Sequence, residues 1–120
     1  MYVSGEHADT SCQIVEKLVD GMKLHNVEIL QGIFPDETGH FIDKKIEFRL
    51  CHIDVDVYQS AKDVVDFIWD KMVSPGGIMV YDDYGFHTCD GITKYVEEQM
   101  LYKDRLVIHN LNGHAIIIKL

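Results

Sequence analysis

Two short acidic motifs lie in the middle of the chain, and their residue types are those of a metal site. Asp54 and Asp56 alternate in the first motif, whereas Asp82 and Asp83 are adjacent in the second. Each motif directly follows an apolar run that favours a β-strand. If both runs are parallel strands, the motifs meet at the carboxyl edge of an open sheet, where α/β proteins bind their ligands. Four carboxylates gathered there repel one another unless a cation or a proton lies among them.

Magnesium is the cation that this pattern favours, because hard divalent cations bind carboxylate oxygens and water. Asp54, Asp82 and Asp83 can supply three carboxylates from neighbouring strand ends. Asp56 points to the same face as Asp54 if the strand continues that far, and it is then free to accept a proton. A structural role is the alternative, since Asp is common in turns and helix caps after strands. Both motifs together, joined by a single helix, favour a functional site.

Several aromatic and histidine side chains surround the motifs. Tyr84 and His87 follow the second motif and are candidate substrate contacts. His52 precedes the first motif, where it can be either a ligand-facing or a core residue. Phe67 and Trp69 lie within a predicted helix, so we expect them to pack against the core.

The elements that must position these residues follow the order α-β-β-α-β-α-β-β. Asn112 and Gly113 separate the last two strands and predict an antiparallel hairpin, while Ser60 and Asp63 resemble a helix-starting capping box. This alternation predicts an α/β fold with a mostly parallel sheet and an antiparallel C-terminal pair. The predicted helices cover 10–23, a segment beginning at Ser60 and a segment beginning near Asp90; the predicted strands cover 27–30, 46–55, 77–82, 106–109 and 115–118.

Composition excludes several classes of function. The chain has 120 residues, enough for one domain, and a net charge of -9, which argues against a nucleic-acid partner. It has no apolar run of the roughly 20 residues that a membrane span needs, and residues 1–7 lack a signal-peptide pattern. Its three cysteines are dispersed, which favours the reducing cytoplasm. We expect Cys51, within a strand, to be a core residue.

Three segments together resemble the macrocin O-methyltransferase (TylF-like) family. They are CHIDVDVYQS at 51–60, VSPGG at 73–77 and DDYG at 82–85, and residues 26–36 and 113–119 also fit the family. Its members are class I enzymes that use S-adenosylmethionine and Mg²⁺ to methylate sugar hydroxyls of natural products. The resemblance implies a small-molecule hydroxyl acceptor.

The resemblance also implies roles for individual residues. Asp54, Asp82 and Asp83 would hold Mg²⁺, and Asp56 would be the general base that removes the proton of the acceptor hydroxyl. The residues that would border the adenine of the cofactor are Gly32, Ile33 and Phe34.

The chain departs from the family at its N-terminal side. The family begins with a strand and a glycine-rich turn that cradles the methionine part of the cofactor, followed by a second strand with an acidic end. Neither precedes the helix at 10–23. We therefore expect residues 1–120 to form a partial, truncated Rossmann-like methyltransferase sheet that starts at the third strand. Its exposed strand edges predict rearranged pairing or a homo-oligomer that completes the sheet.

Two other readings stay open. The chain can be a non-catalytic remnant that keeps the carboxylates without binding the cofactor. A haloacid dehalogenase-type phosphohydrolase also has an apolar strand ending in DxD and a later strand ending in DD. That class spaces its two motifs further apart, with a Ser or Thr strand end and a lysine between them.

Overall fold

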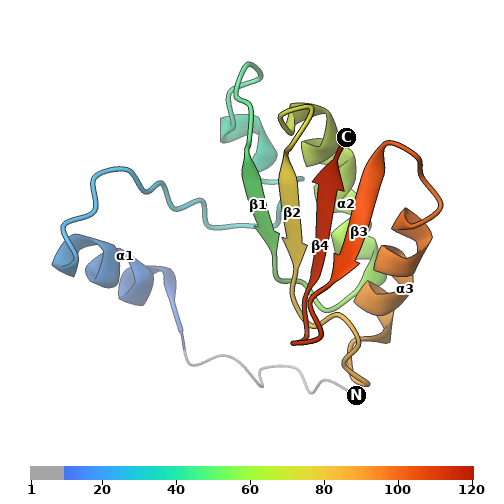
Figure 1. Ribbon diagram of the computed structural model, residues 1–120. Helices are drawn as coiled ribbons and strands as arrows, with labels where there is room; N and C mark the ends of the chain where they lie inside the picture. The colour runs from blue at the N-terminus through green and yellow to red at the C-terminus, as the bar shows by residue number, and fades with distance from the viewer. Residues whose placement is uncertain (1–9) are drawn as a thin grey trace.

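The computed structural model describes residues 10–120 as an open sheet with helices on one face (Figure 1). Four strands have the order β1-β2-β4-β3: the first pair is parallel and the other two are antiparallel. The α/β class and the antiparallel C-terminal pair are thus confirmed. The helices are α1 (Cys12–Gly21), α2 (Tyr58–Ile68) and α3 (Asp90–Gln99), with 3₁₀ turns η1 (Gly39–Phe41) and η2 (Trp69–Lys71); the strands are β1 (Leu50–Ile53), β2 (Ile78–Tyr81), β3 (Arg105–His109) and β4 (Ala115–Lys119).

The core lies between the sheet and the pair α2 and α3. Side chains alternate along the strands, so that Met79, Tyr81, Ala115 and Ile117 are buried beneath these helices. Their neighbours along the same strands, such as Val80, are only half-buried, because no described helix covers the opposite face. Helix α1 lies apart from the sheet (Figure 1) and buries none of its residues.

Two glycines allow close backbone contacts, one between α3 and α2 and one in the turn before β2. A Cβ on Gly91, in the first turn of α3, would lie 2.7 Å from the backbone nitrogen of Tyr58 at the start of α2. A Cβ on Gly77, just before β2, would lie 2.6 Å from the carbonyl oxygen of Val73. Real Cβ atoms do not approach so closely, so each position needs glycine for packing.

The sequence predicted the helices better than the first strands. Residues 27–30 form no strand, because within residues 10–120 they pair with no neighbouring strand. The strand predicted at 46–55 shortens to β1, which pairs only with the four residues of β2. The sheet therefore has fewer parallel pairs than expected. Leu50 is 61% exposed at this edge, so the strand is not buried on both faces.

The capping prediction at Ser60 is wrong. Helix α2 begins at Tyr58, and its N-cap residue Val57 makes no side-chain cap hydrogen bond. Asp63 instead accepts a hydrogen bond from Gln59 within the helix, at 2.7 Å. The helix expected to begin near Asp90 does begin there, with Asp90 as the first residue of α3.

The predicted packing residues lie as expected. Phe67 packs edge-on against Phe34 with 5.1 Å between ring centroids, and Trp69 stacks on the Arg105 guanidinium. Cys51 is half-buried against the core, and burial raises the pKa of its thiol. No helix in the described part of the chain is long and apolar enough to cross a membrane, and the segment considered for a signal peptide lies outside that part.

Candidate active site at the carboxyl ends of β1 and β2

The two acidic motifs lie at the same edge of the sheet because β1 and β2 are parallel and in register. Ile53 at the end of β1 pairs with Tyr81 at the end of β2, and the next backbone amide, that of Asp82, donates to the Ile53 carbonyl at 3.0 Å. Asp54 and Asp82 therefore follow directly from paired strand ends. This is the edge at which open α/β sheets bind ligands.

The carboxylates at this edge affect one another electrostatically. Desolvation raises the pKa of Asp83 above its usual range, and the neighbouring charges of Asp82, Asp56 and Asp54 raise it further. His114 acts in the opposite direction. Asp82, Asp56 and Asp54 thus lie close enough to Asp83 to disfavour its negative charge, a cost that a bound cation would relieve.

The donor atoms fall into two groups at this edge. Asp83, Asp56 and Cys89 each place one donor atom within 4.8 Å of the others, and so do Asp82, His52 and His114. Asp54 is exposed and belongs to neither group among the described residues. The structure thus brings Asp56 and Asp83 together and separates Asp82 into a group with two imidazoles.

The backbone at Asp83 turns sharply. Its φ of 57° is left-handed, a conformation that Asp and Asn adopt more readily than most residues. The Asp83 amide donates to the Oδ1 atom of Asp82 at 2.9 Å, so the first carboxylate of the motif holds the backbone of the second.

Asp56 lies beside the start of α3. Its Oδ1 atom accepts a weak hydrogen bond from the Cys89 thiol, with 3.8 Å between sulfur and oxygen. Burial raises the pKa of Cys89, the Asp83 and Asp56 charges add to this, and a hydrogen bond from Thr88 opposes it. Cys89 therefore stays a neutral thiol at pH 7 and donates to Asp56 rather than acting as a nucleophile.

A largely apolar cavity of about 440 Å³ borders β1 and lies between the strand end and the segment before η1. Phe34 and Asp54 both line it, which places one of the residues predicted to border adenine beside one of the predicted metal ligands. Gly32 and Ile33 do not line it, and Ile33 is 66% exposed. The size and apolar lining are those of a small-molecule site.

A second cavity, of about 350 Å³, is lined by the residues that follow the second acidic motif in the chain and by the β3–β4 hairpin. Tyr84 and His87, the predicted substrate contacts, both line it, together with His109 at the end of β3. The Tyr84 ring packs edge-on against His109, with centroids 4.7 Å apart. The structure therefore brings the two predicted residues into one cavity.

Sequence reasoning missed the residues that come from α3 and the C-terminal hairpin. His114 and His109 approach the site only because β4 pairs antiparallel with β2 and β3 with β4, which places the β3–β4 loop at the same edge. The hairpin signal at Asn112 and Gly113 predicted that loop but not that it lies next to the acidic motifs. Cys89 had no signal, because its position depends on how α3 packs.

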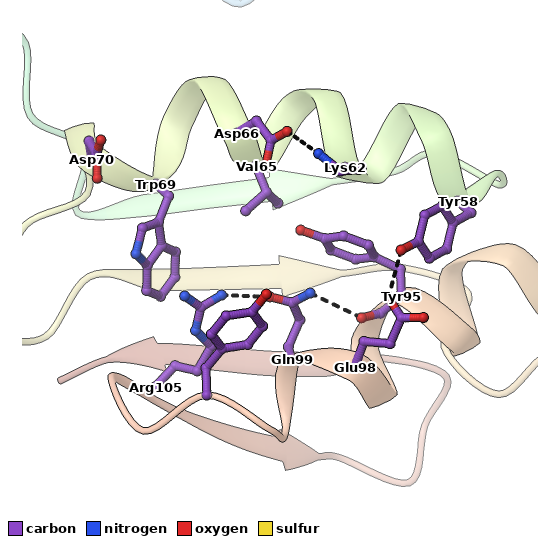
Figure 2. Close-up of a pocket in the computed structure, with 11 residues that line it drawn as sticks. Tyr58, Lys62, Val65, Asp66, Trp69, Asp70, Tyr95, Glu98, Gln99 and Arg105 are labelled. Carbon is purple, nitrogen blue, oxygen red and sulfur yellow. Dashed lines mark hydrogen bonds and ion pairs between the residues drawn. The ribbon is translucent and has the colours of Figure 1, made fainter.

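The pocket drawn in Figure 2 lies elsewhere, between α2 and α3. Its volume is about 300 Å³, and none of the residues predicted for the site lines it. The Arg105 guanidinium stacks 3.8 Å from the Trp69 ring centroid and donates to Gln99, while the Tyr58 hydroxyl donates to Glu98 at 2.6 Å. These groups already have partners, so we interpret the pocket as a structural junction between the helices.

The donor chemistry of the strand ends fits a hard cation in part. Asp54, Asp82 and Asp83 offer the carboxylate oxygens that Mg²⁺ prefers, and their mutual repulsion would fall on binding it. The largely apolar cavity beside β1 adjoins Asp54 at the end of that strand. A glycine-rich turn for the rest of that cofactor is not among the described residues.

Comparisons with known proteins identify the family and the fold of the chain. A search of curated proteins finds no match. A solved structure described as a rRNA methylase from Streptococcus thermophilus shares the fold with a TM-score of 0.63 at 18% identity, over 93% of this chain and 70% of that one. Residues 10–113 match the family described as Macrocin-O-methyltransferase (TylF), which implies use of S-adenosylmethionine. The chain therefore belongs to the macrocin-O-methyltransferase family.

Proposed function

We propose that the chain carries the metal- and acceptor-binding half of a Mg²⁺-dependent O-methyltransferase. The observation that carries this proposal is the gathering of Asp54, Asp56, Asp82 and Asp83 at one sheet edge, where desolvation and the charges of the other three raise the pKa of Asp83. Family membership supplies the reaction class. It also favours methyl transfer over the phosphohydrolase reading.

Asp54, Asp82 and Asp83 would hold the metal ion. When bound, Mg²⁺ supplies a Lewis acid that lowers the pKa of a hydroxyl, and S-adenosylmethionine supplies the methyl group. The negative charge of the carboxylates would also repel an anionic acceptor, which favours an acceptor with an uncharged hydroxyl group.

Asp56 is the proposed general base. Its Oδ1 atom accepts from the Cys89 thiol, and among the described residues its Oδ2 atom has no hydrogen-bond donor. That free oxygen can accept the proton of the acceptor hydroxyl. The thiol contacts only one oxygen of the Asp56 carboxylate, which leaves the other for the proton of the acceptor.

The cavity beside Tyr84, His87 and His109 is the proposed acceptor site. It combines aromatic surfaces with imidazole nitrogens that can donate to or accept from hydroxyl groups, which suits a sugar or another polyhydroxylated natural product. The net charge of -9 also favours a small molecule over a nucleic acid. We place this activity in the cytoplasm, consistent with three free cysteines.

Calorimetry with S-adenosylmethionine, with and without Mg²⁺, tests the proposal. Micromolar binding would support an enzyme. The absence of heat at millimolar cofactor would instead favour the non-catalytic remnant. An Asp56→Asn variant serves as the internal comparison, because it should retain cofactor and metal binding while losing transfer of a radiolabelled methyl group to a sugar acceptor.

We further propose that a second copy of the chain completes the sheet. Among the described strands β1 pairs only with β2, and its other edge carries the exposed Leu50. Light scattering would test this directly. A stable monomer at micromolar concentration would count against it.

A further inference from the structure

The face of the sheet that α2 and α3 leave free, here called the open face, is apolar across all four strands. No helix described within residues 10–120 covers it (Figure 1). The strand register places its side chains in two rows that cross the sheet from β1 to β3: the first is Leu50, Ile78, Ile118 and Leu106, and the second is His52, Val80, Ile116 and Ile108. Apart from His52, every member is a large aliphatic residue. A continuous apolar surface of this kind marks an interaction site on a folded protein.

Helix α1 carries a second apolar surface that is exposed in the described chain. Its apolar side chains recur at helical spacing along one side of the helix, and the polar ones lie on the other. The exposed members of the apolar side are Ile14, Val15, Leu18 and Met22. The helix has 10 residues and buries none of them. An isolated helix shorter than about 12–15 residues is marginal in water, so the apolar side of α1 requires a packing partner.

The two surfaces match in size. A helix of 10 residues is about 15 Å long. The strands have 4 or 5 residues each, which corresponds to about 13–17 Å. A helix about 10 Å across covers two neighbouring strands about 4.8 Å apart. Packed along the central strands β2 and β4, α1 would therefore cover the middle of the open face, with Leu50 and Leu106 flanking it on either side.

The segment after α1 holds the helix away from its own sheet. Residues 24–31 form neither helix nor strand, and further along the chain the Phe34 ring packs against Phe67 of α2. When extended, the segment from Met22 to Phe34 can span up to about 40 Å, which is enough to carry α1 onto a neighbouring molecule. In the structure α1 lies apart from the sheet of its own chain (Figure 1).

We propose that α1 of a second copy of the chain packs on the open face, and that the two copies exchange their α1 helices. Every copy carries both surfaces, so a twofold-symmetric dimer covers both in each copy. Exchange of an identical element between protomers is a low-cost route to a dimer. Binding of an unrelated partner to either surface would leave the other one exposed.

This contact goes beyond the proposed function and differs from the proposed pairing at the edge of β1. It uses the face of the sheet rather than its edge, and it depends neither on a metal ion nor on methyl transfer. Leu106 separates the two dimer contacts, because it lies on β3, at the far side of the sheet from β1.

Sedimentation velocity tests the exchange in the natural protein and in two variants. The natural protein should be a dimer at micromolar concentration. Leu18→Glu on α1 and Leu106→Glu on the open face should each raise the dimer dissociation constant by at least about 100-fold, because each change removes two apolar contacts per dimer and buries two carboxylates. Gln13→Glu, which adds the same charge to the polar side of α1, is the matched control and should dimerise like the natural protein. Circular dichroism checks the fold of each variant, and Ile108→Glu replaces Leu106→Glu if the latter unfolds.

Mixing the two variants distinguishes exchange between copies from packing of α1 on its own sheet. A mixed dimer keeps one undamaged contact, in which the natural α1 of the Leu106→Glu chain packs on the natural open face of the Leu18→Glu chain. The mixture should therefore dimerise at concentrations at which each variant alone is monomeric.

Three results would overturn the proposal. A natural protein that is monomeric at micromolar concentration, or a mixture that dimerises no better than its components, would contradict exchange between copies. A dimer that persists in both Glu variants would instead favour pairing at the edge of β1 alone. None of these results bears on the proposed metal site, which Mn²⁺ titration tests separately.

Discussion

Replacing Asp83 by Asn should stabilise the metal-free protein, because its carboxylate is repelled by the other carboxylates at the strand ends. One carboxylate oxygen of Asp83 lies within 4.8 Å of one of Asp56. Two unit charges at that separation repel by about 0.9 kcal/mol in water and by about 3.5 kcal/mol at an effective dielectric constant near 20. Both side chains are half-buried, so we expect a gain near the lower limit, about 1 kcal/mol.

Asn is a suitable replacement at this position. It matches Asp in shape and adopts the left-handed backbone at φ 57° without added strain. A change of about 1 kcal/mol in a domain of this size corresponds to a rise of about 3–6 °C in Tm. Thermal unfolding followed by circular dichroism resolves a shift of that size. Asp20→Asn, at an exposed position in α1, is the control and should change the free energy of unfolding by less than about 0.5 kcal/mol.

The effect should depend on pH in a defined direction. The folded protein raises the pKa of Asp83 above its ordinary value of 3.8, so the ionised side chain costs folding free energy above the raised pKa. The advantage of Asn is therefore complete above that pKa. It disappears as the pH falls through the raised value towards 3.8, because protonated Asp is also neutral.

Mg²⁺ should reverse the order of stability. The natural protein gains stability by binding the ion, whereas Asp83→Asn loses a ligand and gains less. A variant that is less stable than the natural protein without metal, or an advantage that does not change with pH, would refute the electrostatic interpretation of this edge.

Two further substitutions test how the scaffold positions the site. Gly91→Ala should lower the free energy of unfolding, measured by urea titration, by about 1–3 kcal/mol, because its Cβ would lie 2.7 Å from a backbone nitrogen of α2. Gly21→Ala, which has open space around it, is the control and should leave the free energy of unfolding unchanged or raise it by up to about 1 kcal/mol. Lys119→Met should cost about 1–3 kcal/mol, because the lysine donates to two backbone carbonyls of and just after η2, at 2.8 and 3.2 Å. Lys103→Met, at an exposed position just before β3, is the control and should change the free energy of unfolding by less than about 0.5 kcal/mol in chemical denaturation. Equal losses in the two lysine variants would contradict a stabilising role for the Lys119 hydrogen bonds.

The sequence was sufficient where local pattern and burial agree. The helical spacing of apolar residues predicted α1, α2 and α3, and apolar runs next to turn residues predicted β2, β3 and β4. The placement of Asp54 and Asp82 needed only the rule that parallel strands present their carboxyl ends at one edge. The registered pairing of β1 with β2 satisfies that rule.

The remainder depends on contacts between distant segments. Residues 27–30 have strand-forming side chains, but a strand needs a partner, and within residues 10–120 none pairs with them. The approach of His114 to Asp82 follows from the antiparallel pairing of β4 with β2, which no local pattern specifies. Cys89 approaches Asp56 because Gly91 lets α3 pack closely on α2.

Binding of a divalent cation at the ends of β1 and β2 is the central claim, and Mn²⁺ titration of the natural protein followed by electron paramagnetic resonance tests it most directly. We expect the free Mn²⁺ signal to fall on adding protein, Mg²⁺ to compete, and Asp82→Asn to abolish the effect while the exposed control Asp70→Asn retains it. A natural protein that leaves the Mn²⁺ signal unchanged, or an Asp82→Asn variant that binds as well as the control, would contradict the account.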